Sequence, residues 1–300
     1  MVMVKDEIVF TDLDLDGACS YLVHSWARQK KSKVVTIKVS NLREKFLGWL
    51  NNHKLEDYKQ VYFFDLDTTE IQDLIDKKNV CIFDHHKTHK EEIYKNAEFY
   101  IDVNETSCSK LLYKHYNTLG FLGNLTVEHT HLIALVNDYD CYELKFPESN
   151  KLNFLFWYKN GNKLQNFVND FEHGFHGFTD EQNKIISYHI YKFKKLAESL
   201  ELYTCDIPVS KKKYTFVSAF ADQYINDVAQ YVIDKSKCEV CMLINLKSKR
   251  VYFRKNDGVD LDLGKFAKKV CEGGGHEYAA GGVLNDVILT LSKNFVPING

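Results

Sequence analysis

Short apolar runs alternate with amphipathic segments along the first 90 residues of the chain. Nearly continuous apolar or β-branched runs predict strands, and apolar positions that recur every three or four residues predict helices. The predicted strands are 7–12, 34–40, 60–66 and 80–86, and the predicted helices are 17–31, 42–50 and 68–77. This alternation is typical of βαβ units, and continuous apolar runs are typical of parallel strands buried on both faces.

The pattern changes in the middle of the chain. Helices are predicted at 107–116 and 127–136, residues 148–178 are weakly patterned, and a long amphipathic helix is predicted from Thr179 to about residue 202. Later strands are predicted at 214–219, 238–245 and 250–255, with helices at 225–234 and 262–271. We therefore predict an α/β chain with a parallel-sheet domain at 1–178, a linker helix at 179–203 and a smaller α/β domain at 204–300.

The composition is that of a globular protein. Hydrophobic residues make up 45% and charged residues 27% of the chain, which excludes a disordered or collagen-like protein. No run reaches the roughly 18 apolar residues of a membrane span, and the first residues do not resemble a signal peptide, so a cytoplasmic protein is expected. Eight cysteines without framework spacing predict reduced thiols, and Cys238 and Cys241 are expected to be buried strand residues.

The net charge of −2 excludes a surface that attracts long nucleic acids over its whole extent. The charge is unevenly distributed, because residues 204–300 carry +3 and the remainder carries −5. This distribution is compatible with a metal site in the first part and an anion site in the second. The chain has only three prolines, and Pro147 and Pro208 are interpreted as breaks between elements.

Acidic and imidazole side chains follow three of the predicted strands. Asp12 closes the first strand and is followed by Asp14 and Asp16, Asp65 lies at the end of the third, and Asp84, His85 and His86 close the fourth. The carboxyl ends of parallel strands meet at one edge of a sheet, where α/β proteins bind ligands, so these side chains are expected to converge. The run 12–17 alone is also compatible with a solvated turn, but not with an EF-hand, whose twelfth position would be Val23 instead of Glu.

The donor types at this edge predict a divalent metal. Carboxylates mixed with imidazole, without thiolate, favour Mn²⁺ or Mg²⁺ over structural zinc. Asp138 and Asp140 lie at a predicted helix end, where the dipole disfavours negative charge unless a cation compensates for it. More than four ligands suggest two ions that share a carboxylate, for which Asp65 is the candidate, and paired ions are typical of phosphoester hydrolysis.

Five of the 15 glycines fall within ten residues, in the sequence GGGHEYAAGG that begins at Gly273. The backbone amides of Gly273, Gly274 and Gly275, together with His276, can surround an anion. The segment follows a predicted helix and lacks the lysine of a P-loop, which excludes a nucleoside triphosphate cradle of that kind. Arg254, at a predicted strand end, is a candidate bidentate phosphate ligand. A glycine hinge and an ordinary strand-end arginine are the alternatives.

These motifs together resemble those of the DHH phosphoesterases. DLDLDG, VYFFD, FDHH and VNDYD are similar to four ordered motifs of that family, and GGGHEYAAGG is similar to the signature of its DHHA1 domain. The segments INDVAQYV (225–232) and VYFRKNDGVDLDLGKFAKK (251–269) also resemble DHHA1 sequence. The resemblance spans nearly the whole chain, and it implies a parallel-sheet DHH domain with flanking helices, a linker helix and a small α/β DHHA1 domain.

The resemblance also implies an activity, which is Mn²⁺-dependent hydrolysis of nucleotide phosphoesters by two ions. The metal ligands that it implies are Asp12, Asp14, Asp65, His85 and Asp138. The catalytic candidates are His86, at the reacting phosphate, and its neighbour Asp84. The groups expected to hold a substrate phosphate or terminal nucleotide are Arg254, His276 and the amides of Gly273, Gly274 and Gly275.

One position departs from the family pattern. Several branches have a metal-binding histidine shortly before the first aspartate, where this chain has Ile8, Val9 and Phe10. Either Asp12 and Asp16 take over its role, as in the DxDxDG form of RecJ-type exonucleases, or one metal site is weakened. Asp16 is therefore included among the candidate ligands.

The length of the chain bears on the substrate. RecJ-type exonucleases carry an additional OB-fold for long single strands, for which 300 residues leave no room. The two-domain form resembles nano-RNases, so we expect hydrolysis of short single-stranded RNA or DNA or of linear dinucleotides to 5′-mononucleotides. The alternatives are hydrolysis of cyclic dinucleotides or of 3′-phosphoadenosine 5′-phosphate, and nucleotide binding without turnover. No membrane partner is expected, and both a monomer and a homodimer are compatible with the sequence.

Overall fold

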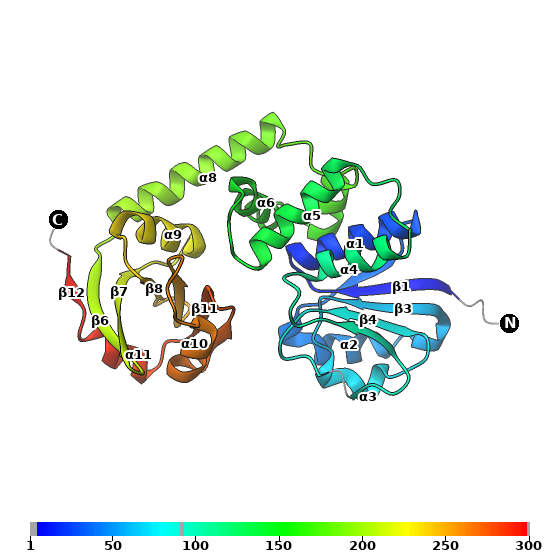
Figure 1. Ribbon diagram of the computed structural model, residues 1–300, viewed down its shortest axis with the longest axis horizontal. Helices are drawn as coiled ribbons and strands as arrows, with labels where there is room; N and C mark the ends of the chain where they lie inside the picture. The colour runs from blue at the N-terminus through cyan, green and yellow to red at the C-terminus, as the bar shows by residue number, and fades with distance from the viewer. Residues whose placement is uncertain (1–4, 91–92, 299–300) are drawn as a thin grey trace. The chain divides into compact units, whose positions relative to one another are not determined.

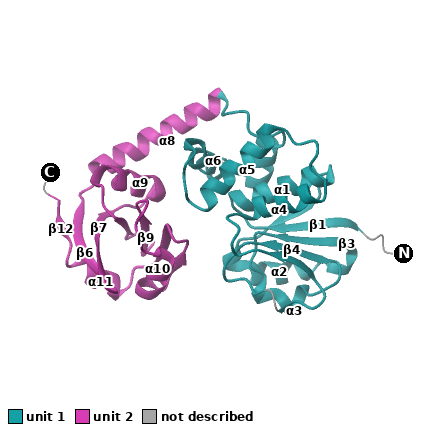
Figure 2. Cartoon of the chain, viewed as in Figure 1, with its two compact units in different colours: residues 1–179 teal, residues 180–300 magenta. Residues whose placement is uncertain are grey.

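The computed structural model describes residues 5–90 and 93–298, which form two compact units (Figure 2). Unit 1 comprises Met1–Thr179, and unit 2 comprises Asp180–Gly300. Among the helices within these described ranges, none combines the length and the apolar character that crossing a lipid bilayer requires.

Unit 1 is built on a five-stranded, fully parallel sheet with the strand order β2-β1-β3-β4-β5. Its strands are β1 (Lys5–Thr11), β2 (Lys33–Thr36), β3 (Tyr58–Phe64), β4 (Val80–Asp84) and β5 (Glu98–Ile101). Its helices are α1 (Leu15–Arg28), α2 (Leu42–Leu50), α3 (Gln72–Ile75), α4 (Cys108–Thr118), α5 (Val127–Asp140), α6 (Pro147–Tyr158) and α7 (Lys163–Phe171). In Figure 1, α1 and α4 cover one face of the sheet and α2 and α3 the other. The predicted parallel α/β architecture is confirmed.

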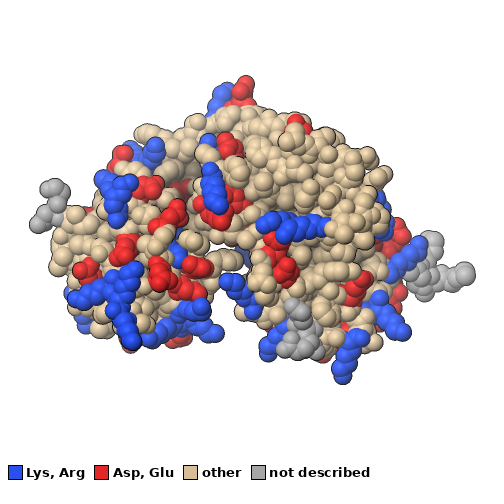
Figure 3. Space-filling view, in the orientation of Figure 1, with Lys and Arg blue, Asp and Glu red and all other residues tan. Residues whose placement is uncertain are grey.

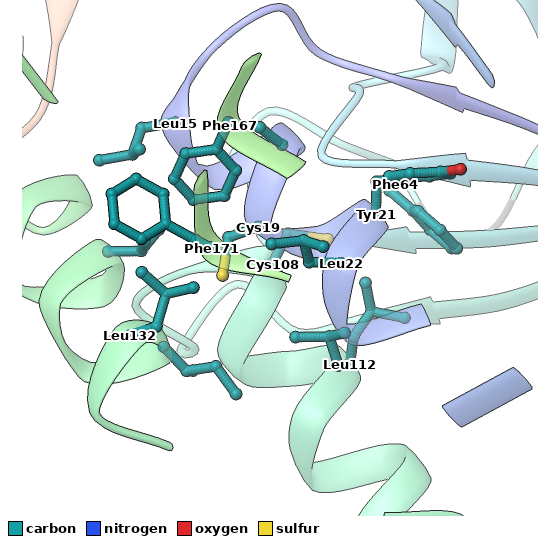
Figure 4. Close-up of a cluster of buried hydrophobic side chains, with 14 of the residues drawn as sticks. Leu15, Cys19, Tyr21, Leu22, Phe64, Cys108, Leu112, Leu132, Phe167 and Phe171 are labelled. Atoms are coloured by element: carbon teal, nitrogen blue, oxygen red, sulfur yellow. The ribbon is translucent and has the colours of Figure 1, made fainter. Parts of the chain in front are cut away.

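Alternate side chains of the central strands enter two separate cores. Val9, Phe64 and Phe83 pack beneath α1 and α4, in the cluster that Figure 4 shows in part. Phe10 and Phe63 pack on the opposite face, against α2. Because helices cover both faces, the central positions of these strands, 8–10 in β1 and 61–64 in β3, are apolar without alternation, which explains the continuous runs in the sequence.

The strand order creates a switch point between β1 and β3. From β1 the chain passes through α1 to β2 on one side, and it then returns to β3 on the other side of β1. The connections that leave the carboxyl ends of β1 and β3 therefore diverge, and in open α/β sheets ligands bind in this crevice. Asp12 and Asp14 follow β1, and Asp65 follows β3, so all three lie at this point.

Residues 148–178 are more regular than the sequence analysis indicates, because they form most of α6 and all of α7. The buried residues of α7 are Leu164, Phe167, Val168 and Phe171, which have the spacing of an amphipathic helix. The prediction of weak patterning is therefore wrong there. Pro147 does not end an element but occupies the first turn of α6, where its missing N–H costs no helical hydrogen bond.

Unit 2 begins with α8 (Asp180–Ser199) and contains a seven-stranded sheet. The strand order is β10-β11-β9-β8-β7-β6-β12, and all neighbours are antiparallel except β7 and β8. The strands are β6 (Tyr203–Val209), β7 (Lys212–Phe220), β8 (Val240–Asn245), β9 (Arg250–Lys255), β10 (Gly274–Gly275), β11 (Ala279–Val283) and β12 (Val296–Pro297). The helices α9 (Ile225–Ser236), on one face, and α10 (Leu263–Cys271) and α11 (Asp286–Ser292), on the other, bury its two cores.

Pro208 lies inside β6, so its interpretation as a break before the second domain is wrong. The carbonyl of Leu202 accepts a hydrogen bond from the amide of Ile298, so even-numbered backbone groups of this strand face β12. The pairing with β12 extends only over Tyr203 and Thr204, and at Pro208 the backbone nitrogen faces an edge without a partner strand in the described residues. A proline there removes no ladder hydrogen bond.

Two phenylalanines of β7 provide a matched test of the unit 2 core. Phe216 is fully buried, whereas Phe220 is 50% exposed. We expect Phe216→Ala to lower the free energy of unfolding by about 3–5 kcal/mol, and Phe220→Ala by no more than about 0.5 kcal/mol. Urea denaturation followed by circular dichroism measures both, and equal losses would contradict the packing of Phe216 in the core.

Candidate functional site

Carboxylate and imidazole groups meet at the carboxyl ends of β1, β3 and β4 in unit 1. The Nε2 atom of His85 lies 3.3 Å from Oδ1 of Asp65 and 3.4 Å from Oδ2 of Asp140. The same nitrogen lies 3.9 Å from Oδ2 of Asp16. Two groups of potential metal ligands share this histidine, the first with Asp65 and His86 and the second with Asp16 and Asp140. We call the carboxylates of Asp12, Asp14, Asp16, Asp65 and Asp140 with the ring of His85 the acidic cluster.

Asp65 enters the acidic cluster through an unusual backbone conformation. Its φ angle is 57°, in the left-handed region, and its amide donates a hydrogen bond to the carbonyl of Phe83. Aspartate tolerates this region better than most residues, although the conformation still costs on the order of 1 kcal/mol or more. Such strain persists where the surrounding structure fixes it, and here it turns the chain sharply at the end of β3.

Asp12 and Asp14 are held by the start of α1. Asp14 is the N-cap of α1, and its Oδ1 accepts a hydrogen bond from the amide of Gly17 at 2.8 Å. A side chain at Gly17 would lie 2.4 Å from the carbonyl oxygen of Asp12, so only glycine permits this turn. The Asp12 carboxylate accepts a hydrogen bond from the amide of Leu13 and remains partly exposed.

Asp16 has a structural partner as well as a place in the acidic cluster. Its carboxylate accepts hydrogen bonds from the amides of Cys108, at 2.6 Å, and Ser109, at 3.0 Å. These amides belong to the first turn of α4, where a negative charge is stabilised by the helix dipole. Asp16 therefore anchors α4 to α1, and its oxygens are less available to a metal than those of Asp65.

Asp138 is not part of the acidic cluster. Its oxygens accept hydrogen bonds from the amides of Lys145 and Phe146 and from the hydroxyl of Ser149, so it caps the start of α6. Asp140 occupies the place in the cluster that the motif resemblance implies for Asp138. Residues two apart on a helix point in nearly opposite directions, so only one of this pair can face the sheet edge.

The acidic cluster fits a divalent cation. Oδ2 of Asp140 is buried, and it accepts no hydrogen bond from the residues that the structure describes. Burial, together with the neighbouring Asp14 carboxylate, raises the pKa of Asp12 to about 7. Burial and the Asp16 charge also hold the pKa values of Asp65 and Asp140 well above the usual range. Only a positive charge allows these carboxylates to ionise together at neutral pH, and oxygen donors with imidazole suit hard divalent ions.

Asp84 pairs with two histidines. Its Oδ1 lies 2.6 Å from Nδ1 of His86, and its Oδ2 lies 2.6 Å from Nδ1 of His89. Burial disfavours the charged forms of Asp84 and His86, but the hydrogen bonds between Asp84 and the two histidines outweigh the effect of burial. They hold the pKa of Asp84 below its usual range and raise the pKa of His86 to about 9. Nε2 of His86 makes no hydrogen bond within the described ranges, so it is the nitrogen available to a ligand.

Sequence reasoning missed His89. It is buried, and its Nε2 lies 2.8 Å from the hydroxyl of Tyr94 and 3.2 Å from Oγ1 of Thr68. The residue therefore connects Asp84 to the loop after β3 and fixes the orientation of the carboxylate. The signal in the sequence is a third histidine shortly after the adjacent pair, but its spacing alone does not distinguish it from a surface residue.

The glycines of unit 2 have a packing role. A side chain at Gly273 would lie 1.9 Å from the carbonyl oxygen of Gly281, and Gly275 has a φ angle of 138°. Glycine is required at both positions because the backbones of β10 and β11 approach each other closely. By contrast, a side chain at Gly274 would meet no atom within 4 Å, and His276 is exposed beside it. The predicted anion-binding role of this segment stays a prediction.

Arg254 is buried between β9 and the start of α9. Its guanidinium donates hydrogen bonds to the carbonyl of Phe253, at 2.7 Å, and to the side chain of Asn226. Asn226 belongs to the first turn of α9, so the arginine lies next to exposed amides of a helix N-terminus. Acidic and basic side chains are intermingled on the face shown in Figure 3, so any anion site here is local.

No protein-family model and no curated protein matches the sequence. Several solved structures nevertheless share the fold. PggH, a pGpG-specific phosphodiesterase from Vibrio cholerae, is 14% identical with a TM-score of 0.60, and the match covers 96% of each chain. A DHH domain described as belonging to a family of ribosomal proteins is 13% identical with a TM-score of 0.63, over 96% of this chain and 86% of that one.

A third match is RecJ from Thermus thermophilus in complex with Mn²⁺, which is 14% identical with a TM-score of 0.52. The match covers 97% of this chain but only 51% of RecJ. The chain therefore has the fold of DHH-domain proteins, which confirms the architecture that the sequence resemblance implies.

The raised pKa values predict how a divalent cation stabilises the protein. Without a cation, Asp12 favours folding when it is protonated, below about pH 4, and this contribution is lost as the pH rises through about 7. Protons and cations compete for the same oxygens, so we expect added Mn²⁺ to raise the thermal unfolding midpoint more at about pH 7.5 than at about pH 5. Circular dichroism melts of metal-stripped protein measure both shifts.

Two asparagine variants control this measurement. Asp65→Asn keeps the left-handed backbone accessible but removes the charge, and it should abolish most of the Mn²⁺ shift. Asp257→Asn, at an exposed position of unit 2, should keep the full shift. An identical Mn²⁺ shift at both pH values, or in both variants, would contradict a cation site at the acidic cluster.

Proposed function

We propose that this chain is a Mn²⁺-dependent phosphodiesterase that hydrolyses short oligonucleotides or linear dinucleotides to 5′-mononucleotides. The observation that carries the proposal is the acidic cluster at the sheet switch point, in which the buried Oδ2 of Asp140 lacks a hydrogen-bond partner among the described residues. The shared fold of PggH, described as a pGpG-specific phosphodiesterase, supports a linear dinucleotide as substrate.

Asp12, Asp14, Asp65, His85 and Asp140 would hold two Mn²⁺ ions, with Asp65 as the shared carboxylate. Asp16 would support them as a weaker ligand, because α4 already occupies its oxygens. When bound, the ions supply Lewis-acid stabilisation of the phosphoryl oxygens and a more acidic water. The positions before Asp12 add no ligand, since Ile8, Val9 and Phe10 are fully buried in the two cores of unit 1.

His86 would act on the phosphoryl group itself. Asp84 accepts a hydrogen bond from Nδ1 and holds the ring in one orientation, which directs Nε2 away from the carboxylate. With Nδ1 paired to Asp84, a protonated ring would present Nε2–H as a donor to an anionic oxygen. This contact stabilises charge that develops on the phosphate during in-line displacement.

Unit 2 would bind the substrate end. The amides of Gly273, Gly274 and Gly275, the exposed His276 and the guanidinium of Arg254 would contact a phosphate or terminal nucleotide.

A substrate panel tests the proposal. It contains a 5′-labelled dinucleotide, a pentamer, a long single strand, cyclic di-AMP and 3′-phosphoadenosine 5′-phosphate, each with Mn²⁺. We expect 5′-mononucleotides from the dinucleotide and pentamer only. Asp65→Asn should reduce the rate by at least about 100-fold, since it removes a ligand, and Asp257→Asn should not. The products formed from each compound and by each variant are measured by chromatography. Inactivity on all five compounds would contradict an enzyme, and turnover of only the last two would favour the alternative substrates.

Arg254 is tested by separating substrate affinity from metal affinity. Arg254→Gln should raise KM by about 10-fold or more, the cost of losing a charge-assisted hydrogen bond, while the Mn²⁺ concentration for half-maximal rate stays within about twofold. Arg254→Lys should have a KM between that of the wild type and that of Arg254→Gln. Circular dichroism confirms that each variant is folded. A weakened Mn²⁺ response with normal KM would contradict the substrate role.

A further inference from the structure

A cavity of about 130 Å³ adjoins the acidic cluster within unit 1. Asp14, Asp16 and Asp140 line one part of it, and Asn153 and Trp157 of α6 line another. Its volume is below the roughly 300 Å³ at which pockets enclose a whole drug-sized ligand. A nucleotide with its phosphate at the acidic cluster would therefore leave its base outside the cavity, beside the α6 residues that line it.

Trp157 lines the cavity and is also 40% exposed, so part of its indole is accessible to a ligand. Lys163 makes a cation–π contact with the indole, and its Nζ lies 5.4 Å from the ring centroid. This ammonium also donates hydrogen bonds to the carbonyls of Trp157, at 2.8 Å, and Lys159, at 3.0 Å, so it is fixed at the end of α6.

A second ammonium on the indole is not fixed in this way. Nζ of Lys38 lies 5.5 Å from the ring centroid, and within residues 5–90 and 93–298 it has no ion pair or hydrogen bond. Lys38 follows β2 at the carboxyl edge of the sheet, and the backbone of the next residue, Val39, hydrogen-bonds to the carboxylate of Asp12. An exposed ammonium that no ion pair holds among the described residues therefore lies over a partly exposed aromatic ring beside the acidic cluster.

We propose that Trp157 stacks on the base of the nucleotide next to the reacting phosphate, while Lys38 leaves the indole to contact that phosphate. The inference rests on the proposed function, because it takes the acidic cluster as the phosphate position. An indole accepts any base, since every base has a π face, and stacking on aromatic side chains stabilises single-stranded nucleotides. The pair thus supplies affinity for a nucleoside phosphate without strong preference among bases.

The test compares a ligand that has a base with one that lacks it. AMP and ribose 5-phosphate are titrated into the full chain with Mn²⁺ by isothermal calorimetry. Trp157→Ala should weaken AMP binding by about 5- to 100-fold and leave ribose 5-phosphate within about twofold. Lys38→Ala should weaken both ligands alike. Tyr158→Ala, at the neighbouring residue, 53% exposed and outside the cavity, is the matched control and should change neither.

A conservative variant gives a direct signature of stacking. Trp157→Phe should keep AMP affinity within about threefold, yet lose the AMP-induced quenching of tryptophan fluorescence, because only Trp26 and Trp49 remain. Equal losses of AMP and ribose 5-phosphate in Trp157→Ala, no loss of either, or no AMP binding by the wild type would overturn the proposal. If the wild type hydrolyses the dinucleotide while Trp157→Ala binds AMP normally, only the stacking role fails. If Trp157 governs AMP binding but nothing is hydrolysed, only the proposed activity fails.

Discussion

Crowded negative charge at the carboxyl ends of three parallel strands is the constraint around which unit 1 is organised. Burial and mutual repulsion disfavour ionisation of Asp12, Asp65 and Asp140, so these carboxylates ionise together at neutral pH only when positive charge is supplied. The fold brings these groups together nevertheless, through a left-handed residue at the end of β3 and a glycine without which the turn into α1 could not form. A protein that had no use for the charges could relieve them by a single substitution.

Five acidic residues of this region divide into two sets. Asp16, Asp84 and Asp138 each have partners inside the protein, respectively the start of α4, two histidines and the start of α6. Asp65 and Asp140 instead direct oxygens at His85 across distances longer than good hydrogen bonds. The first set builds the frame, and the second set is left for a ligand. The carboxylates of the frame fix the helices and loops around the sheet edge. Asp65 and Asp140 therefore depend on the frame for their positions.

The sequence predicts the parallel sheet and its acidic edge well, because both arise from short-range patterns. Apolar runs give the strands, and Asp65 or His85 directly after a run must lie at a strand end. The choice of Asp140 over Asp138 depends on the rotation of α5 relative to the sheet, which tertiary packing sets. The role of His89 depends on a loop closing over Asp84, and the glycines of β10 and β11 are explained by a close backbone contact that no local pattern reveals.

Pro208 has a consequence for encounters between molecules. The outer edge of β6 beyond Thr204 has no partner strand among the described residues, and an open edge is a template on which a second chain can add a strand. Pro208 removes one of the outward-facing amide donors that such an addition requires, while the ladder to β7 remains intact. The residue therefore protects unit 2 against edge-to-edge aggregation, and its value is greatest when the protein is concentrated.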